Sequence, residues 1–484
     1  MDEFIQYLRK FPTDSLIYEL SKISIAMFNN RKFIYSFPIT TKWHGTHSVS
    51  ISPWDILNIE YLSIRYGNDY RKGYLKNDLR KLSALYREYE NCVFKPSKHE
   101  SSEHTKTWEM LLGITTEQFI FQQRSLINSI DSFNRNYHLL FTSRFSSFHK
   151  ELMIEKIFQE IFSISPNDYL SIALTVFWLC TQHPDPLSAP EHIYRKKDDT
   201  VLTNDNLERF VSYYSCSYFD IRESHLQKQI FYSKPFIKTK KNNMYLSSNL
   251  YLVHRLLANG IYWVIRDYYY RSGSSKFINM FGILFEEYIK ELASSYCNPT
   301  EWSKLAEGKL KSADFQFKLG DATLFVEAKS ALLGLTARQQ IPDENAIGQF
   351  LNKIEEAYEQ LQSTVKKAKT HDDHKPIKII LLYDDFSDTG ILQQCLPKIF
   401  QNDPLCFIVT IKEFEILLKL WKDDRKIAIR IILEMEDQIK IDSLNRKNLT
   451  EIFNKFSVWN ISHFAGDSNY YGSIVLSQLS KELH

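Results

Sequence analysis

The sequence predicts an α/β domain in the C-terminal part of the chain, joined to a larger and mostly α-helical N-terminal region. Residues 312–330 alternate in polarity on either side of a Gly-Asp pair, as a β-hairpin does. Residues 377–383 and 405–410 form apolar runs typical of buried strands, and helical periodicity dominates from about residue 52 to 185. We therefore expect a central mixed sheet flanked by helices, preceded by the helical region.

The composition is that of a folded protein with more than one domain. The 484 residues exceed the usual size of a single domain, and 44% of them are apolar, which is enough for extensive cores. The formal net charge is only +2, so a surface that binds nucleic acid would have to be a local patch.

The sequence also bounds the compartment. The six cysteines are scattered and form no Cys-x-x-Cys pair, which predicts no zinc site and fits a reducing cytosol. The N-terminus lacks the basic and apolar stretches of a signal peptide, and no run of about 18 uncharged apolar residues predicts a membrane span. We expect a cytoplasmic protein with no membrane partner.

The N-terminal region is expected to extend over residues 1–190. Residues 1–30 have helical periodicity, and the following residues up to 50 look extended. Ser52 before Pro53 is a typical helix start, because serine caps a helix and proline suits its first turn. A Pro-rich break at residues 184–190 predicts the end of the region.

One stretch of this region, residues 66–91, interleaves tyrosines with lysines and arginines. Such interleaving can bind single-stranded nucleic acid through base stacking and phosphate contacts. It also fits an amphipathic helix with aromatic core residues, which is the interpretation that we favour.

Residues 191–274 are predicted to form a connecting region with a second hairpin and a helix. The hairpin turns at residues 241–243, and Lys238, Lys240 and Lys241 cluster at its tip. These lysines could contact a phosphate backbone, although a charged turn is more often simply solvated.

A helical pattern from about residue 247 to 296 is interrupted at residues 271–275. After the interruption, apolar residues recur at helical spacing and predict a stripe that faces the core. The residues of this stripe are Phe277, Phe281, Leu284, Tyr288 and Leu292.

The hairpin at 312–330 follows this helix, and its turn predicts its register. Gly320 supplies the positive φ that a two-residue type II′ turn needs at Gly320-Asp321. The turn pairs these residues: Leu319 with Ala322, Phe317 with Leu324, Phe315 with Val326, Asp314 with Glu327 and Ser312 with Lys329.

This register puts the apolar residues on one face and gathers Asp314, Glu327 and Lys329 on the other. Two carboxylates opposed across a hairpin repel each other. A divalent cation makes such a pair favourable, because carboxylate oxygens suit Mg²⁺, and Lys329 could orient a water or meet a phosphate charge. The alternative is a solvent-facing cluster in which Lys329 neutralises one carboxylate.

At these residues the chain resembles the PD-(D/E)XK nuclease superfamily, which has the restriction-endonuclease-like fold. The match is Asp314, twelve intervening residues, and then Glu327-Ala328-Lys329. Ala313 stands where the family usually has proline. The resemblance implies metal-dependent phosphodiester hydrolysis, with Mg²⁺ or Mn²⁺ held by Asp314, Glu327 and the carbonyl of Ala328. Lys329 would position or deprotonate the attacking water.

Members of the superfamily often carry a further acidic ligand on the helix before the hairpin, in a Gly-x-x-Phe-Glu pattern. Gly282-Ile-Leu-Phe-Glu286 matches this pattern. The resemblance therefore implies that Glu286, rather than Glu287 on the exposed side, is an outer ligand or a ligand of a second metal.

The superfamily also often places a glutamine near the metal site, on the helix after the hairpin. Here that helix is predicted from about residue 343 to 369, and Gln349 and Gln360 are the candidates. Helical periodicity puts both on the polar side, and Lys353 stands where a Gln-x-x-x-Tyr spacing would have tyrosine.

The resemblance covers about residues 275–425, which we predict to be the nuclease domain, followed by a helical extension over residues 426–484. It implies a nuclease that acts on DNA, while the N-terminal region would select the substrate or a partner. Large nucleases with helical partner regions resemble bacterial restriction or antiphage-defence effectors, so we expect a homo-oligomer or a partner protein of a defence system. The alternatives are a non-catalytic nucleic-acid-binding or scaffold subunit and an RNA-cleaving nuclease.

Overall fold

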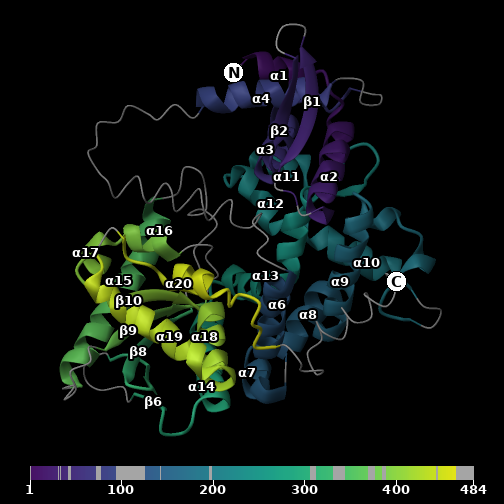
Figure 1. The fold of residues 1–484 in the computed structure, drawn as a ribbon. Helices are drawn as coiled ribbons and strands as arrows, with labels where there is room; N and C mark the ends of the chain where they lie inside the picture. The colour runs from purple at the N-terminus through teal and green to yellow at the C-terminus, as the bar shows by residue number, and fades with distance from the viewer. Residues whose placement is uncertain are drawn as a thin grey trace. The chain divides into compact units, whose positions relative to one another are not determined.

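The computed structural model describes residues 2–30, 32, 34–41, 45–71, 78–93, 126–141, 143–195, 199–305, 312–330, 344–368, 376–383, 389–442 and 445–464. The chain divides into two compact units, and each combines stretches that are far apart in the sequence. The N-terminal unit holds the described residues up to 93 and residues 153–260, and the C-terminal unit holds the described residues of 126–152 and 261–464. Figure 1 labels their helices and strands.

The N-terminal unit is mostly helical and holds two small sheets. Its elements are α1 (Asp2–Leu8), α2 (Thr13–Asn29), β1 (Tyr35–Thr41), β2 (Gly45–Ile51), α3 (Pro53–Tyr66), α4 (Leu79–Val93), α8 (Ile154–Phe162), α9 (Pro166–Gln182), α10 (Asn204–Tyr213), β3 (Ser215–Ser217), α11 (Tyr218–Glu223), α12 (Ile230–Ser233), β4 (Phe236–Lys238), β5 (Tyr245–Ser247) and the first half of α13 (Leu250–Arg271). Strands β1 and β2 are antiparallel, and β4 pairs in parallel with β3 and antiparallel with β5. The predicted extended stretch and the second hairpin are both confirmed.

Local sequence explains where the first helices begin. The predicted single helix over residues 1–30 is two helices, because Pro12, with extended backbone, disfavours helical geometry before it and starts α2 after it. The start at Ser52 is confirmed. The Ser52 hydroxyl accepts the N–H of Asp55 (3.3 Å), and the Asp55 carboxylate accepts the N–H of Ser52 (2.6 Å).

The boundaries of the two units differ from the predicted domain boundaries. Residues 199–247, expected in a separate connecting region, belong to the N-terminal unit. There Arg222 donates to the carbonyl of Ile64 (2.6 and 2.9 Å), and the Ser21 hydroxyl donates to the carbonyl of Ser247 (2.5 Å). Such long-range contacts leave no mark in the local composition from which a boundary is predicted.

The C-terminal unit is built around a five-stranded mixed sheet. Its elements are α6 (Leu126–Phe141), α7 (Ser146–Glu151), the second half of α13, α14 (Lys276–Tyr296), β6 (Trp302–Lys304), β7 (Phe315–Leu319), β8 (Ala322–Lys329), α15 (Glu344–Lys367), β9 (Ile377–Leu382), α16 (Thr389–Gln394), α17 (Pro397–Phe400), β10 (Cys406–Thr410), α18 (Ile411–Asp423), α19 (Arg425–Glu436) and α20 (Leu449–Phe456). The strand order is β10-β9-β8-β7-β6. Strand β7 pairs antiparallel with both β6 and β8. Strand β9 pairs parallel with both β8 and β10.

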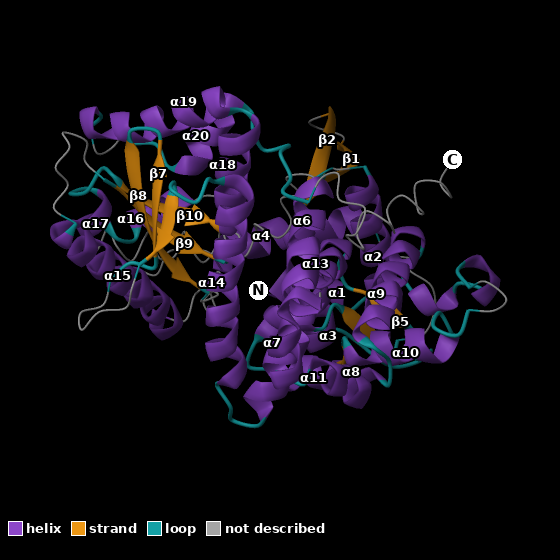
Figure 2. Cartoon of the chain, turned by 90° about the horizontal axis from the view of Figure 1, so that it is seen from below, coloured by secondary structure: helices purple, strands orange, loops and turns teal. Residues whose placement is uncertain are grey.

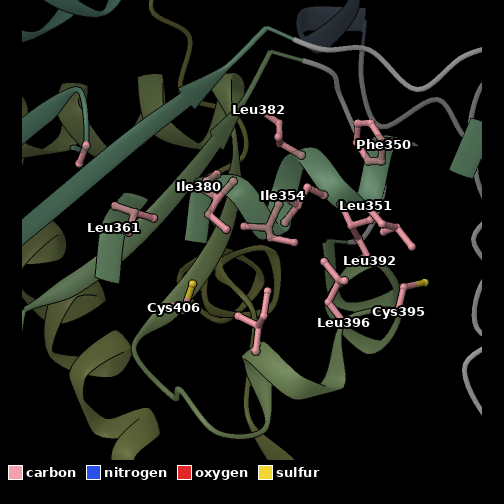
Figure 3. Close-up of a cluster of buried hydrophobic side chains, with 14 of the residues drawn as sticks. Phe350, Leu351, Ile354, Leu361, Ile380, Leu382, Leu392, Cys395, Leu396 and Cys406 are labelled. Atoms are coloured by element: carbon pink, nitrogen blue, oxygen red, sulfur yellow. The ribbon is translucent and has the colours of Figure 1, made fainter. Parts of the chain in front are cut away.

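Helices cover both faces of this sheet. Figure 2 shows α15, α16 and α17 on one side and α18 on the other. On the first side, Ile354 and Leu361 of α15 pack with Phe325 of β8 and Ile380 of β9 in a fully buried cluster (Figure 3). The predicted α/β architecture of the C-terminal part is therefore confirmed, as are the strands at 377–383 and 405–410. The sequence does not predict β6, because three residues show no alternation.

A buried ion pair joins α6 to α18 within the C-terminal unit. The Arg135 guanidinium donates from two nitrogens to the two carboxylate oxygens of Glu415, at 2.6 and 2.9 Å, and both side chains are at most 2% exposed. The Tyr288 hydroxyl of α14 also donates to Glu415, at 2.7 Å. Burial alone would raise the pKa of Glu415, but the Arg135 charge lowers it below its usual value. Three helices thus meet at one carboxylate.

In the part of the chain that the structure describes, no helix combines the length and apolar character that crossing a membrane requires.

We predict that Arg135→Met lowers the free energy of unfolding by about 3–5 kcal/mol, because it leaves the Glu415 carboxylate buried without its counter-charge. Urea denaturation followed by fluorescence measures the change. The control is Lys22→Met, which removes an ion pair whose side chains are 50% and 34% exposed and should cost under about 1 kcal/mol. Equal losses in the two variants would contradict the structural role of the Arg135–Glu415 pair.

Candidate active site

The hairpin of β7 and β8 has the predicted register over its full ladder. Leu319 pairs with Ala322, Phe317 with Leu324, and Phe315 with Val326. Gly320 has a φ of 68°, as the first residue of the turn requires. The apolar face is buried as predicted, with its phenylalanine, leucine and valine side chains at most 2% exposed.

The ladder stops one residue before the predicted pair of Asp314 with Glu327. Strand β7 begins at Phe315, and the N–H of Asp314 donates to the carbonyl of Val326 (3.0 Å), which is already the partner of Phe315. Two consecutive residues therefore face one, as in a β-bulge, which redirects the side chain at such a position. The predicted pairs of Asp314 with Glu327 and of Ser312 with Lys329 are not part of the ladder.

The two carboxylates nevertheless come together. Asp314 accepts the N–H of Ala328 at 2.8 Å, and Ala328 is the residue directly after Glu327. Because the N–H and C=O of one strand residue point to the same edge, the carbonyl of Ala328 lies on the Asp314 side of β8. The structure thus brings together Asp314, Glu327 and the backbone of Ala328 at the end of the hairpin.

Lys329 lies between Glu327 and a helix. Its ammonium donates to Glu327 Oε1 at 2.7 Å and to Gln360 Oε1 of α15 at 2.9 Å. An ammonium has three donors, and these contacts use two of them. No contact with another described residue uses the third donor, which can bind a further group at this site.

Gln360 belongs to the site, whereas Gln349 does not. Gln349 is exposed. The buried face of α15 includes Ala357 and Thr364, two small residues that are not strongly apolar. This face is therefore turned toward Gln360, whose side chain is half-buried beside Lys329.

Thr364 also holds the segment that carries Asp314. Its hydroxyl accepts the N–H of Ala313 at 2.7 Å and donates to the carbonyl of Gln360 at 2.9 Å. No sequence motif predicts this contact. The only local signal for it is a threonine one helical turn after Gln360, at a position that an apolar residue would usually fill.

The carboxylate of Glu286 lies at the edge of the site and is engaged by a lysine. Lys304 of β6 donates to Glu286 Oε2 at 2.7 Å. Glu287 instead pairs with Lys290 of its own helix. Glu286 contributes to the raised pKa values of Asp314 and Glu327, so its charge acts on both carboxylates. No sequence motif predicts that Lys304 contacts this site, because it lies in the short strand β6.

Burial dominates the electrostatics of the pair. It raises the pKa of Glu327 to about 7, and the nearby Asp314 charge adds to this shift while Lys329 opposes it. Burial also raises the pKa of Asp314 to about 6, against the lowering effect of the Ala328 N–H. Both shifts mean that the charged forms are costly unless a cation lies beside them.

One oxygen of Glu327 has no hydrogen-bond partner among the described residues. This atom, Oε2, is buried, whereas Oε1 accepts a hydrogen bond from Lys329. A buried carboxylate oxygen in this state carries a desolvation penalty that a cation would remove. Two carboxylates and a backbone carbonyl are donors of the type that Mg²⁺ takes, so the residues present fit a divalent cation.

Other predicted residues lie elsewhere. Lys238, Lys240 and Lys241 belong to the N-terminal unit. Among the described residues, no group of three or more His, Cys, Asp or Glu side chains is arranged to hold a metal, in agreement with the engagement of Glu286 by Lys304. Within the described ranges, the candidate site therefore consists of Asp314, Glu327, Lys329 and Gln360, with Glu286 at its edge.

Comparison of the chain with protein-family models, with curated proteins and with solved structures found no match.

We predict that metal-free protein loses stability as the pH rises from about 4 to 7. In this window folded Asp314 and Glu327, with pKa values of about 6 and 7, hold protons that the unfolded chain, with values of 3.8 and 4.5, has released. Asp314→Asn should weaken this dependence and raise the Tm at pH 8 by about 5 °C, for a gain of about 2 kcal/mol.

Thermal melts in EDTA from pH 4 to 8 test this prediction. Asp423→Asn is the control, because the Asp423 side chain is 52% exposed. The prediction fails if wild type and Asp314→Asn have parallel profiles of Tm against pH.

Proposed function

We propose that the C-terminal unit is a divalent-metal-dependent nuclease that hydrolyses phosphodiester bonds of DNA. The observation that carries the proposal is the buried Glu327 carboxylate near Asp314. One of its oxygens accepts a hydrogen bond from Lys329, and the other has no partner in the part of the chain that the structure describes. A solvent-facing salt-bridge cluster would have exposed carboxylates with ordinary pKa values, but Glu327 is only 2% exposed.

The proposal extends to the fold. We interpret the mixed sheet, with α14 before it and α15 after the hairpin, as a restriction-endonuclease-like core. Its support is the order of elements, in which an antiparallel hairpin is followed by a helix and two parallel strands. The acidic residues lie where the hairpin ends, next to the start of the parallel part of the sheet.

Asp314, Glu327 and the carbonyl of Ala328 would hold Mg²⁺ or Mn²⁺. A bound metal would polarise a phosphoryl oxygen and offset the charge on the leaving oxygen. Glu286 would contribute from a greater distance, because Lys304 engages it. In the absence of metal, the raised pKa values of Asp314 and Glu327 favour their protonated forms.

Lys329 would act on the water or on the phosphate. Two of its N–H donors are fixed by Glu327 and Gln360, so the third has a defined direction. It can hold a water by its oxygen or donate to a phosphoryl oxygen as negative charge develops there. Gln360 keeps the ammonium in place, which makes it a positioning residue.

We predict that full-length protein cleaves DNA with Mg²⁺ and not with EDTA, and that Asp314→Asn and Lys329→Ala each lower the rate at least 100-fold. The assay uses plasmid DNA, linear single-stranded DNA and total RNA. Calorimetry should show weaker Mg²⁺ binding by Asp314→Asn, whereas Lys329→Ala should still bind DNA, since its affinity comes from many phosphate contacts.

The outcomes separate the alternatives. Cleavage of RNA alone would replace DNA as the substrate. Binding without cleavage of any substrate would favour a scaffold subunit over an enzyme. If Lys329→Ala cleaves within about tenfold of wild type at saturating Mg²⁺, Lys329 only neutralises the carboxylates. We also propose a role in antiphage defence, as a homo-oligomer or with a partner protein.

We predict a smaller effect for Gln360→Ala, about 10-fold in rate, because Lys329 keeps its bond to Glu327 but loses its second anchor. Gln349→Ala is the matched control on the same helix, since Gln349 is exposed. Gln360→Glu should retain the anchor and thus more activity than Gln360→Ala. The positioning role is refuted if Gln360→Ala and Gln349→Ala are equally active.

A further inference from the structure

Three segments of the N-terminal unit meet at one exposed surface. Arg9, just after α1, donates from Nε to the carbonyl of Tyr66 at 3.0 Å. The Arg71 guanidinium, in the turn after α3, donates to the carbonyl of Arg9 at 3.3 Å. Lys241, at the tip of the β4–β5 hairpin, donates to the carbonyl of Arg71. The structure thereby joins the Tyr- and Arg-rich stretch to the lysine hairpin, two features that are about 170 residues apart.

The contacts of this surface leave its positive charge in place. Within the part of the chain that the structure describes, Arg9, Arg71 and Lys241 donate to backbone carbonyls and form no ion pair. A carbonyl accepts a hydrogen bond but does not cancel a unit charge. Like charges gathered in this way repel, so the arrangement favours a polyanionic partner.

The carboxylates that contact this surface are already engaged. Asp69 is 7% exposed. Its carboxylate pairs with Arg222 at 2.7 Å and lies 3.6 Å from the ammonium of Lys240, so one negative charge is divided between two cations. Asp14 is also buried and accepts the hydroxyl of Tyr218 and the N–H of Lys241. The exposed atoms of the surface are therefore mainly cationic and aromatic.

Two tyrosines complete the surface. Tyr70 is 80% exposed, and the ammonium of Lys240 lies 4.5 Å from the centre of its ring. Tyr66 is 36% exposed. An exposed ring beside a cation can stack on a base while the cation contacts the adjacent phosphate. A duplex, with its bases stacked inside, offers such a ring nothing to stack on.

We propose that this basic–aromatic patch binds single-stranded nucleic acid, with phosphates on its cations and a base on Tyr70. The patch consists of Arg9, Tyr66, Tyr70, Arg71, Lys240 and Lys241. The proposal rests on the proposed function in one respect: the bound strand is the substrate of the C-terminal unit. Binding itself needs no catalysis.

Fluorescence anisotropy of full-length protein in EDTA tests the patch, with labelled 20-nucleotide single-stranded DNA, single-stranded RNA and duplex DNA. Tyr70→Ala should weaken single-strand binding about 10-fold. The double variant Lys240→Gln/Lys241→Gln should reduce the slope of log K against log salt by about 1.4. The controls are Tyr270→Ala, at a tyrosine that is 74% exposed, and Lys156→Gln, at a lysine side chain that is 60% exposed.

The patch is refuted if its variants bind single strands as tightly as wild type, or if the control variants weaken binding equally. It is also refuted if wild type binds no nucleic acid, which would point to an acidic protein as the partner. Comparison of the DNA and RNA oligonucleotides shows which kind of single strand the patch binds. Loss of binding by the patch variants, in a protein that does not cleave with Mg²⁺, would support the patch and refute the nuclease. Cleaving wild-type protein with normally binding patch variants would refute the patch alone.

Discussion

The two-residue turn at Gly320 is the constraint on which the candidate site depends. It sets the register of β7 and β8, and a slip of one residue would exchange their two faces. With this register, the phenylalanines of β7 are buried on one face. Glu327 and Lys329 then point to the opposite face, where α15 supplies Gln360. The chemistry of the site is therefore fixed by packing on the other side of the sheet.

The sheet in turn is held by helices that come from distant parts of the chain. Helix α6 lies about 280 residues before Glu415 in the sequence, yet its Arg135 forms the buried ion pair. A buried pair of this kind contributes little net stability. A fold that buried only one of the two charges would be strongly destabilised, because that charge would have no counter-charge. It joins α6 to the C-terminal unit, which therefore contains residues from both sides of the predicted boundary at residue 190.

The sequence predicted the register of the β7–β8 ladder, the two later strands of the sheet and the proximity of Asp314, Glu327 and Lys329, because each depends on local alternation or on a turn residue. It could not predict the bulge at Asp314, since a bulge depends on hydrogen bonds to Val326 and Thr364 rather than on polarity. It placed Gln360 on the polar side of α15 because Ala357 and Thr364 are not strongly apolar, although both are buried. The basic–aromatic patch was visible only as two separate segments.

The hydrogen bond between Ala313 and Thr364 couples the position of the site to helix α15. A proline at position 313 would lack the N–H that Thr364 accepts. In this chain Ala313, directly before Asp314, and Lys329 each donate a hydrogen bond to a side chain of α15. A small displacement of α15 would therefore move Asp314 and the Lys329 ammonium together.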